Sequence, residues 1–454
     1  MKILYFLIVT FSIFHNSAAQ SGCWDEISNE ASAIALKNDG TLWTWGWNVY
    51  NQLGDGTTID KNLPTQIGTS AYWHKISSGY SRTYAIKMDG TLWGWGRNDT
   101  GYLGIGNNLP VATPIQIGVA NNWIKISAGF DHCIALKNDG TLWGWGNNLY
   151  GQLGDGTAID KYTPIQIGTE NNWSEITAGS NFNVALKNNG TLWSWGDNFV
   201  GTIVTSNLPL QVGVANDWNK IVSGNGHTTA IKNNGTLWAW GWNYFGQLGT
   251  GTNLNSIEPI QIGTETNWTT AISGWNHVIA LKNDGTAWSW GLNSSGQLGD
   301  GTTVNKNIPQ QIGLENQWNT ISAGWFSSFG IKNDGTLWSW GQNASGQLGI
   351  GNFSASLIPV AVTCPTSLLS TTENTTISNL VKVYPNPTKD ILTIETSGAL
   401  VEEINVFDIQ GKLLYTLNLN DPKYDLNISN LNAGIYIMKL QTNQGIQRIK
   451  VIKT

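Results

Sequence analysis

One eight-residue segment recurs seven times along this chain of 454 residues. The first copy reads Asp-Gly-Thr-Leu-Trp-Thr-Trp-Gly (39–46), and the later copies differ from it by a few substitutions. A fixed period of this length indicates a repeat architecture, in which no single unit can bury its apolar face alone. Seven units are enough to close a ring. The turn glycines lie 50 residues apart, with one step of 45, at Gly40, Gly90, Gly140, Gly190, Gly235, Gly285 and Gly335.

Each repeat has the pattern of four short strands, as the second repeat illustrates. Alternating apolar and polar residues predict strands over 73–76, 84–87, 91–95 and 114–117. The Asp89-Gly90 pair suits the tight turn between the second and third strands, because glycine tolerates positive φ. Pro114 is expected at the first position of the fourth strand, where it interrupts no hydrogen-bond ladder. Seven such units predict an all-β chain whose main part is a seven-bladed β-propeller.

The third repeat carries the motifs of a known family. It contains Trp123, Gly-x-x-His-x-x-Ala-Leu (129–136), Asp-Gly-x-Leu-Trp-x-Trp-Gly (139–146) and Asn-x-x-Gly-Gln-Leu-Gly (148–154). This pattern resembles the regulator-of-chromosome-condensation repeat, and the resemblance extends over residues 24–362. The resemblance implies a seven-bladed propeller, in agreement with the strand pattern.

The resemblance leaves the activity open. The founding eukaryotic member is a guanine-nucleotide exchange factor for a nuclear GTPase, whereas secreted bacterial members, including a β-lactamase inhibitor, bind other proteins through one propeller face. A shared fold alone supports neither assignment. The N-terminus favours export, because an apolar run (3–14) followed by Ser17-Ala18-Ala19 predicts a signal peptide over residues 1–19.

The composition excludes nucleic acid as a partner. Charged residues make up 12% of the chain and the net charge is −6, with no basic patch to offset phosphate charge. Beyond the signal peptide, no segment is apolar enough to span a membrane. We therefore expect a mature chain outside the cytoplasm, with the propeller over residues 20–365 and a Ser/Thr/Asn-rich linker over 366–379.

The tail over residues 380–454 is expected to be a separate domain. It lacks tryptophan and shows short alternating runs with turn signals such as Gln410-Gly411, which predict a small β-sandwich. Its motifs at 383–387, 407–412 and 431–436, with a basic end over 448–453, resemble the C-terminal sorting domain of the type IX secretion system of Bacteroidetes. The resemblance implies the type IX machinery as a partner, and a secreted or surface-attached product.

A set of aromatic residues outside the repeated framework marks one propeller face. Four of the 25 tryptophans occupy no framework position, and strand order places them on the face formed by the first and third loops of each repeat. The residue after the first-loop glycine is also aromatic in repeats 2, 3, 6 and 7, with Glu30 in repeat 1. Aromatic anchors of this kind suit interfaces and sugar rings, although some could instead plug the central tunnel. The predicted binding face comprises Trp47, Tyr80, Phe130, Trp242, Trp275, Trp325 and Phe326.

Polar residues are expected at the tunnel mouth beside these rings. They are Arg82, Asp131, His132, His227 and His277. The three histidines share one repeat position, which favours a structural role over zinc binding. Neither a catalytic triad nor a phosphate loop is present, so we expect no cofactor, no metal and no catalytic residues. The lysines before the hairpin turns are expected to form a solvated edge.

These features favour a non-enzymatic protein that binds a protein partner through the aromatic face. Three alternatives remain open: a glycan-binding propeller, a polysaccharide-degrading enzyme using Asp131 and His132, and an activity like that of the exchange factor.

The three cysteines make a prediction about ring closure. Cys23 and Cys364 bracket the array, and alignment on an internal repeat places them three positions apart in one virtual loop, which predicts a disulfide between them. Cys133 is expected to be a free, buried hydrophobe. The last strand, over 359–362, is expected to join the blade of Trp24 and so close the ring.

Overall fold

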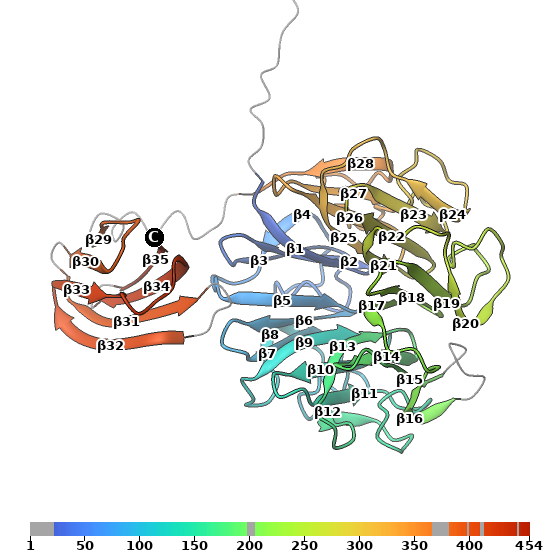
Figure 1. The fold of residues 1–454 in the computed structure, drawn as a ribbon, viewed down its shortest axis with the longest axis horizontal. Helices are drawn as coiled ribbons and strands as arrows, with labels where there is room; N and C mark the ends of the chain where they lie inside the picture. The colour runs from blue at the N-terminus through green and yellow to red at the C-terminus, as the bar shows by residue number, and fades with distance from the viewer. Residues whose placement is uncertain (1–21, 198–204, 366–380, 397–398, 409–412, 443–444) are drawn as a thin grey trace, which may run out of the picture.

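The computed structural model describes residues 22–197, 205–365, 381–396, 399–408, 413–442 and 445–454. Every regular element in these ranges is a β-strand, and the strands form a propeller and a smaller sandwich (Figure 1). The predicted fold class is confirmed. The predicted signal peptide and the Gln410-Gly411 turn lie outside the described residues.

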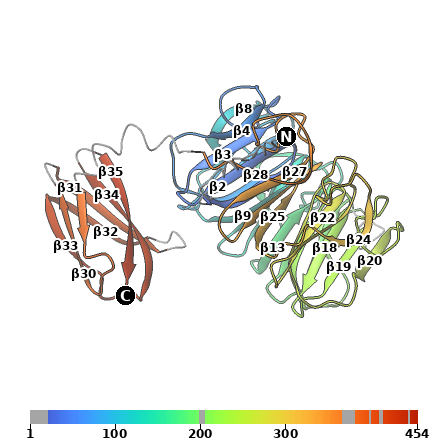
Figure 2. The ribbon, with the colours of Figure 1, turned by 90° about the horizontal axis from the view of Figure 1, so that it is seen from above.

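Each repeat folds into one four-stranded antiparallel blade, and we number the blades 1 to 7 in chain order (Figures 1 and 2). The first strands of neighbouring blades contact one another, so they line the axis of the ring. These first strands are β1 (Trp24–Asn29), β5 (Trp73–Ser78), β9 (Trp123–Ala128), β13 (Trp173–Ala178), β17 (Trp218–Ser223), β21 (Trp268–Ser273) and β25 (Trp318–Ala323).

The second and third strands form the middle of each blade and carry its most buried side chains. The second strands are β2 (Ser32–Lys37), β6 (Arg82–Lys87), β10 (His132–Lys137), β14 (Phe182–Lys187), β18 (His227–Lys232), β22 (His277–Lys282) and β26 (Ser327–Lys332). The third strands are β3 (Leu42–Gly46), β7 (Leu92–Gly96), β11 (Leu142–Gly146), β15 (Leu192–Gly196), β19 (Leu237–Gly241), β23 (Ala287–Gly291) and β27 (Leu337–Gly341).

The fourth strand of each blade is an outer edge strand that begins earlier than the sequence predicted. In blade 2 it covers Val111–Gln116, so Pro114 lies inside the strand and not at its start. An edge strand accepts proline because the missing amide hydrogen would face solvent. The fourth strands are β4 (Lys61–Gln66), β8 (Val111–Gln116), β12 (Lys161–Gln166), β16 (Ser206–Gln211), β20 (Ser256–Gln261), β24 (Lys306–Gln311) and β28 (Ser356–Val362).

The Asp-Gly-Thr-x-Trp segment of each repeat builds its own turn. In blade 2, Gly90 has a φ of 77°, and the Asp89 carboxylate accepts a hydrogen bond from the Thr91 amide at 3.0 Å. The Thr91 hydroxyl in turn accepts one from the Trp93 indole at 2.9 Å. The first tryptophan of the pair is therefore oriented by the turn that precedes it.

The second tryptophan of each pair joins its blade to the blade before it. Trp95 is fully buried, and its indole nitrogen donates to the Gln52 carbonyl in the third loop of blade 1 at 2.9 Å. The ring lies directly over Gly54, where a Cβ atom would come within 2.5 Å of the indole nitrogen. The Gly-Gln-Leu-Gly motif is explained by this contact, because only glycine leaves room for the ring.

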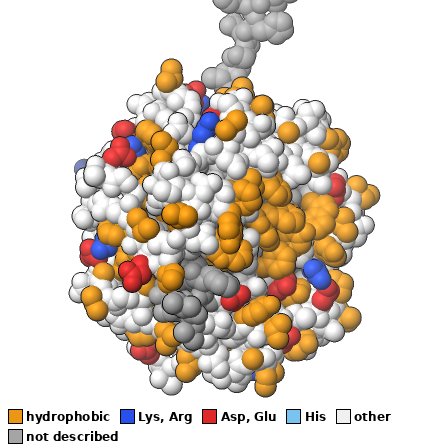
Figure 3. Space-filling view, turned by 90° about the vertical axis from the view of Figure 1, so that its right-hand side faces the viewer, with side chains coloured by type: hydrophobic (Ala, Val, Ile, Leu, Met, Phe, Trp, Pro, Cys, Tyr) orange, Lys and Arg blue, Asp and Glu red, His pale blue; other side chains and the backbone are white. Residues whose placement is uncertain are grey.

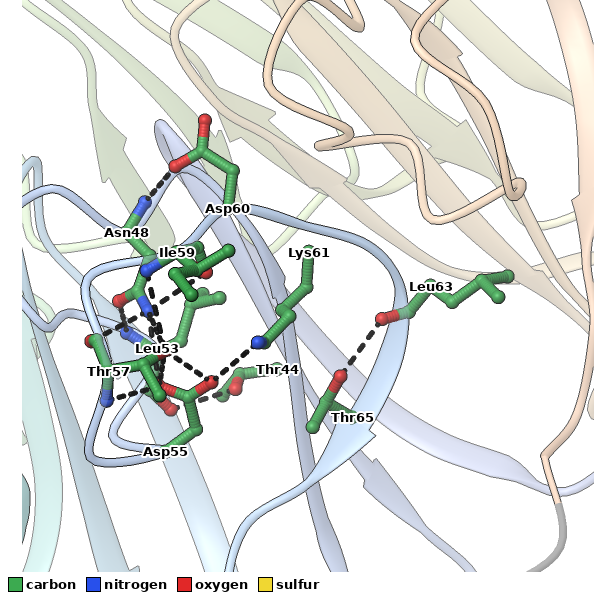
Figure 4. A network of polar contacts seen from close by, with 10 residues as sticks. All are labelled: Thr44, Asn48, Leu53, Asp55, Thr57, Ile59, Asp60, Lys61, Leu63 and Thr65. Atoms are coloured by element: carbon green, nitrogen blue, oxygen red, sulfur yellow. Dashed lines mark hydrogen bonds and ion pairs between the residues drawn. The ribbon is translucent and has the colours of Figure 1, made fainter.

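A buried asparagine holds the third loop in shape in six blades, and Figure 4 shows the loop of blade 1. In blade 1 the Asn48 side chain donates to the Asp55 carboxylate at 3.1 Å and accepts from the Leu53 amide at 3.0 Å. Asp55 also accepts from the Thr57 amide at 2.9 Å and forms an ion pair with Lys61 at 3.3 Å. The polar side chains of the Asp-Gly-Thr residues therefore form hydrogen bonds and an ion pair within their own blade.

Blade 4 is the exception, because its third loop lacks the Gly-Gln-Leu-Gly motif. Ser194 and Trp240 are fully buried, and neither the serine hydroxyl nor the indole nitrogen has a hydrogen-bond partner within the described part of the chain. In blades 6 and 7 the equivalent serine hydroxyls donate to a leucine carbonyl of the third loop, at 2.7 and 2.8 Å. Among the described residues, blade 4 therefore lacks the serine bond of blades 6 and 7, and Trp240 of blade 5 lacks the indole bond that Trp95 makes to the preceding blade.

The lysines before the hairpin turns are packed between tryptophans, so the expectation of a solvated edge was wrong. The Lys187 ammonium lies 4.9 Å from the ring centre of Trp173 and 3.6 Å from that of Trp193. It also pairs with the Glu170 carboxylate at 2.8 Å. Cation–π attraction between two rings retains the charge at a site where only 6% of the side chain is exposed.

The ring closes without exchanging a strand. β28 pairs with β27 of its own blade, so the expectation that this strand joins the blade of Trp24 was wrong. The reason is that each repeat already supplies all four of its strands. The Trp24 amide donates to the Gly335 carbonyl at 3.1 Å, as the Trp123 amide does to the Gly90 carbonyl at an internal junction.

The predicted disulfide between Cys23 and Cys364 is present, with a Cα–Cα distance of 6.2 Å, and Cys133 is free and buried. The disulfide joins the entry to blade 1 with the residues that follow β28.

The tail forms a sandwich of a three-stranded and a four-stranded sheet. Leu392, Ile394, Ile404, Met438 and Leu440 are fully buried between them. The strands are β29 (Val381–Tyr384), β30 (Ile391–Thr396), β31 (Val401–Asp408), β32 (Leu413–Asp421), β33 (Lys423–Asn427), β34 (Gly434–Thr442) and β35 (Gly445–Lys453).

We expect the double substitution Cys23→Ser/Cys364→Ser to lower the free energy of unfolding of the propeller. The disulfide spans 341 residues, and the chain-entropy relation assigns about 5 kcal/mol to a loop of that size as an upper estimate. Urea denaturation of the variant and of the wild type, each with and without reductant, measures the difference. Equal midpoints for oxidised wild type and variant would contradict a stabilising role.

Candidate functional site

The first loops of the seven blades converge around the axis and are held by backbone hydrogen bonds. The Trp275 amide donates to the Gly324 carbonyl at 3.0 Å, and the Asn225 amide donates to the Trp275 carbonyl at 3.1 Å. Six of the seven loops begin with a glycine, and blade 1 has Asn29 there; in blades 3 to 6 the residue three positions later packs against the glycine. A Cβ atom on Gly129 would lie 2.4 Å from the His132 ring. The residue after that glycine is thereby presented toward the axis.

Four of the predicted aromatic residues form a closed cluster of rings, which we call the aromatic cluster. Tyr80 and Phe130 stack at 5.0 Å between ring centres, and Trp275 and Trp325 meet at 5.0 Å. The two pairs join through contacts of 4.6 Å (Tyr80 to Trp325) and 5.5 Å (Phe130 to Trp275). Because Phe130 and Trp275 come from blades 3 and 6, the cluster crosses the axis. The alternative of rings plugging the tunnel therefore applies to all four.

The rings remain partly exposed on one face of the propeller. Trp47 extends the cluster through a 5.5 Å contact with Tyr80, and Phe326 stacks on Trp325 at 5.6 Å. All six side chains are half-buried. Figure 3 looks onto this face and shows hydrophobic side chains gathered in one contiguous patch to one side of its centre. We call this surface the aromatic face.

Trp242 belongs to the same face but not to the cluster. Its ring lies 6.2 Å from Tyr244 and covers Gly226, where a Cβ atom would come within 2.5 Å of it. It lines a separate cavity of about 60 Å³ with Ser180, Asn225 and Asp197, between blades 4 and 5. The sequence placed Trp242 on the correct face but could not show that polar first loops separate it from the other rings.

Glu30 is the acidic residue of the aromatic face. It lines a cavity of about 30 Å³ on the axis together with Tyr80, Phe130 and Trp275. Burial raises the pKa of this carboxyl from 4.5 to about 8, against a smaller opposing effect of the Arg82 charge. Glu30 is therefore mostly protonated at neutral pH.

A larger pocket opens between blades 7 and 1, and we call it the blade 7–1 pocket. Its volume is about 160 Å³, and four of the predicted aromatic residues form its walls. Glu30, Gln342 and Gln347 supply polar groups. The aromatic lining residues are Trp47, Tyr80, Trp325 and Phe326.

The polar residues predicted at the tunnel mouth do not open onto it, with one exception. Arg82, His132, His227 and His277 are fully buried, so their predicted position was wrong, whereas Asp131 is half-buried. The Arg82 guanidinium reaches across to blade 3 and donates to the Phe130, Gly129 and His132 carbonyls at 2.6 to 2.9 Å. These four side chains lie beneath the first loops, and Arg82 supports the loop of blade 3 through its hydrogen bonds.

The histidines act as neutral packing groups. His132 donates from Nε2 to the Asn183 side-chain oxygen at 2.8 Å, since the Asn183 amide itself donates to the Gln152 carbonyl. His277 makes the equivalent bond to Ser328 at 2.9 Å. Burial lowers the pKa of His132 to about 4 and those of His227 and His277 to about 3. None of the three can serve as an accessible general base.

Across the described ranges, no group of three or more His, Cys, Asp or Glu residues is arranged to hold a metal ion. Within those same ranges, no helix has the length and apolar character required to cross a membrane.

Comparison with known families identifies both parts of the chain. Residues 107–379, more than half of the sequence, match the RCC1-like domain. The protein belongs to the RCC1-like family. Regulator of chromosome condensation (RCC1) repeats match at residues 39–86 and 73–101. Residues 382–454 match the secretion system C-terminal sorting domain, which confirms the expected nature of the tail.

Solved structures agree with this RCC1-like fold. Human WBSCR16 is 21% identical with a TM-score of 0.65, and the match covers 72% of this chain and 94% of that one. Prp20p from Saccharomyces cerevisiae is 20% identical with a TM-score of 0.66, covering 77% and 90%. Among curated proteins, ulvan lyase NLR42 from Nonlabens ulvanivorans is 34% identical over 64 residues, which is 14% of this chain and 12% of that protein.

Sequence reasoning missed three contributors to the aromatic face. Tyr50 contacts Trp47 at 5.4 Å between ring centres, and Gln342 and Gln347 line the blade 7–1 pocket. Gln347 belongs to the framework motif Gly-Gln-Leu-Gly, so its position carried no distinguishing signal. Gln342 occupies the repeat position of Trp47 and Trp242, which is the signal that could have revealed it.

We expect Glu30→Gln to stabilise the propeller in a pH-dependent way. A folded-state pKa of about 8 against an unfolded value of 4.5 means that the folded state holds the extra proton between these values. The wild type should then lose stability as the pH rises from 4.5 to 8, on the order of 1 kcal/mol per pH unit. Urea midpoints should coincide near pH 4.5 and separate in favour of the variant up to pH 8. A constant difference across this range would contradict the raised pKa.

Proposed function

We propose that this RCC1-like propeller is a non-enzymatic binding protein that recognises a protein partner through its aromatic face. The observation that carries the proposal is the aromatic cluster with Trp47 and Phe326 added: six rings in mutual contact, half-buried and gathered on one side of the propeller. Rings held by one another lose little conformational freedom on binding, which is the property of interface hot spots.

The placement of the chain supports a role outside the cell. The sorting domain indicates export by the type IX secretion system to the cell surface or the surrounding medium. An extracellular partner is therefore proposed, and a nuclear GTPase is not favoured.

Two features bear on the alternatives. A glycan-binding role is the second candidate, because half-buried Trp and Tyr rings also stack on sugars and a short segment resembles a protein named as an ulvan lyase. A polysaccharide-degrading role through Asp131 and His132 is less favoured, because His132 is fully buried and neutral.

We expect Trp325→Ala to weaken capture of the partner while leaving the propeller folded. Truncating a hot-spot tryptophan costs about 2 kcal/mol, which is roughly 30-fold in affinity. The experiment isolates the partner from the extracellular fraction with the secreted chain and compares affinities by surface plasmon resonance. Leu314→Ala is the matched control, because this side chain is 98% exposed and lies in a crossing between blades on the opposite face. Equal affinities for Trp325→Ala and wild type would refute the proposal.

The same preparation distinguishes the alternatives. A glycan array with wild type and Trp325→Ala tests sugar binding directly. Polysaccharide turnover that is lost in Asp131→Asn would establish the enzymatic alternative. Phe182 fills the position of His132 in blade 4, so His132→Phe preserves packing and tests the histidine separately.

We expect deletion of residues 380–454 to retain the propeller in the periplasm without lowering its stability. The hydrophobic core of the tail consists only of tail residues, so deleting the tail takes no side chain from the core of the propeller. Fractionation and immunoblotting measure the location, and thermal unfolding of the purified propeller measures stability. Normal surface display of the shortened chain would rule out the sorting role.

A further inference from the structure

We propose that the blade 7–1 pocket binds the alkylammonium group of a lysine side chain from the protein partner. The inference rests on the proposed function and deepens it, because it names the chemical group that the aromatic face recognises. Three observations carry it: the arrangement of the rings, the unpaired acidic group among them, and the size of the pocket.

The rings form walls at steep angles to one another. Trp325 meets Tyr80 at an interplanar angle of 88° with ring centres 4.6 Å apart, and Trp47 meets Tyr80 at 53° and 5.5 Å. Phe326 stacks on Trp325 and extends that wall. Rings set at such angles can direct the negative faces of several π systems into one space, which is the arrangement that attracts alkylammonium groups.

Glu30 provides the charge complement. Glu30 lines the pocket, and neither an ion pair nor a side-chain hydrogen bond joins its carboxyl to another of the described residues. The enclosed carboxylates of the third loops behave differently: Asp55, Asp155 and Asp300 are 9 to 13% exposed, and each pairs with a lysine. When the Glu30 carboxyl ionises, it has no paired cation among the described residues until one enters the pocket.

The volume of the blade 7–1 pocket suits one side chain and not a larger ligand. At about 160 Å³ the pocket is well below the roughly 300 Å³ at which sites for drug-sized molecules begin. A lysine offers four methylenes for contact with the rings and a compact ammonium for the carboxyl. The planar guanidinium of arginine prefers two parallel bonds to a carboxylate, and Glu30 is walled by rings, so lysine is the better match.

The other charged and titratable groups near Glu30 do not provide a partner. Tyr80 lines the pocket and is neutral, since burial raises its pKa above 10. The charge of Arg82 partly offsets the effect of burial on the pKa of Glu30, but its guanidinium donates hydrogen bonds to three carbonyls of blade 3 and forms no ion pair with Glu30. Arg97 lies beyond the pocket, over Tyr50, and pairs with Asp99 at 2.6 Å. Entry of an ammonium would therefore shift the protonation of Glu30 itself.

Binding should consequently release a proton at neutral pH. The empty pocket holds Glu30 protonated below a pKa of about 8, and an ammonium favours the ionised form. The apparent affinity is reduced by the fraction of protein in the competent state, so it should fall about tenfold for each pH unit below 7. Lysine itself loses its charge near pH 10.4, which sets an optimum between about pH 8 and 10.

The test uses the full secreted chain and two small probes, Nα-acetyl-lysine amide and its uncharged isostere Nα-acetyl-norleucine amide. Proton NMR titration follows the terminal methylene, which ring currents shift upfield when it enters the pocket. We expect saturable binding of the lysine probe, at least tenfold weaker binding of the norleucine probe, and loss of lysine affinity in Glu30→Gln and Trp325→Ala. Leu314→Ala, which alters an exposed side chain in a crossing between blades on the opposite face, is the control and should retain binding.

Several outcomes would overturn the inference. Equal binding of the two probes, affinity independent of pH between 6 and 8, or tighter binding of choline than of the lysine probe would each do so. Failure of lysine binding remains distinguishable from failure of the proposed function. If the lysine probe does not bind but Trp325→Ala still weakens partner capture, the aromatic face binds its partner through another group.

Discussion

The contact between the second tryptophan of each pair and the loop of the preceding blade holds this propeller together. The indole nitrogen donates to a loop carbonyl while the ring lies over a glycine, as Trp145 does at Tyr102 and Gly104. One residue thus contributes a large apolar area at each junction and, among the described residues, a directional bond at six of the seven. Because the contact runs from one blade to the next, no blade is complete until its neighbour is in place, and the ring is stable only as a whole.

Blade 4 departs from this rule, and the aromatic cluster lies on other blades. The third loop of blade 4 is shorter in sequence and lacks the motif, and within the described residues Ser194 and Trp240 make no hydrogen bond like those of Ser289 and Trp290. The six rings of the aromatic cluster and its extension come from blades 1, 2, 3, 6 and 7. The junctions between adjacent blades of this set keep the indole bond, which gives the rings rigid support.

The sequence predicts the propeller well because the contacts that shape each hairpin turn lie within a single repeat. Asp89, Thr91 and Trp93 specify a turn by local hydrogen bonds, and seven copies of such a unit leave little ambiguity. Expectations failed where the deciding contacts are not local, as two cases illustrate. The burial of Arg82 and His132 depends on how loops of neighbouring blades fold over them, and the pairing of β28 depends on competition between two blade edges. The contact of Phe130 with Trp275 crosses the ring axis, so no spacing within a repeat could reveal it.

The disulfide also determines how the propeller bears mechanical load. Cys364 follows β28 directly and precedes the residues that lead to the tail, so tension applied from the tail reaches Cys364 first. Without the disulfide, that tension would fall on the hydrogen bonds of an edge strand and could peel β28 from blade 7 one bond at a time. With it, the load passes through a covalent bond to Cys23 and is divided between the first and last blades. A chain that is pulled across a membrane, or held at a surface by its C-terminal end, can therefore keep its aromatic face in shape.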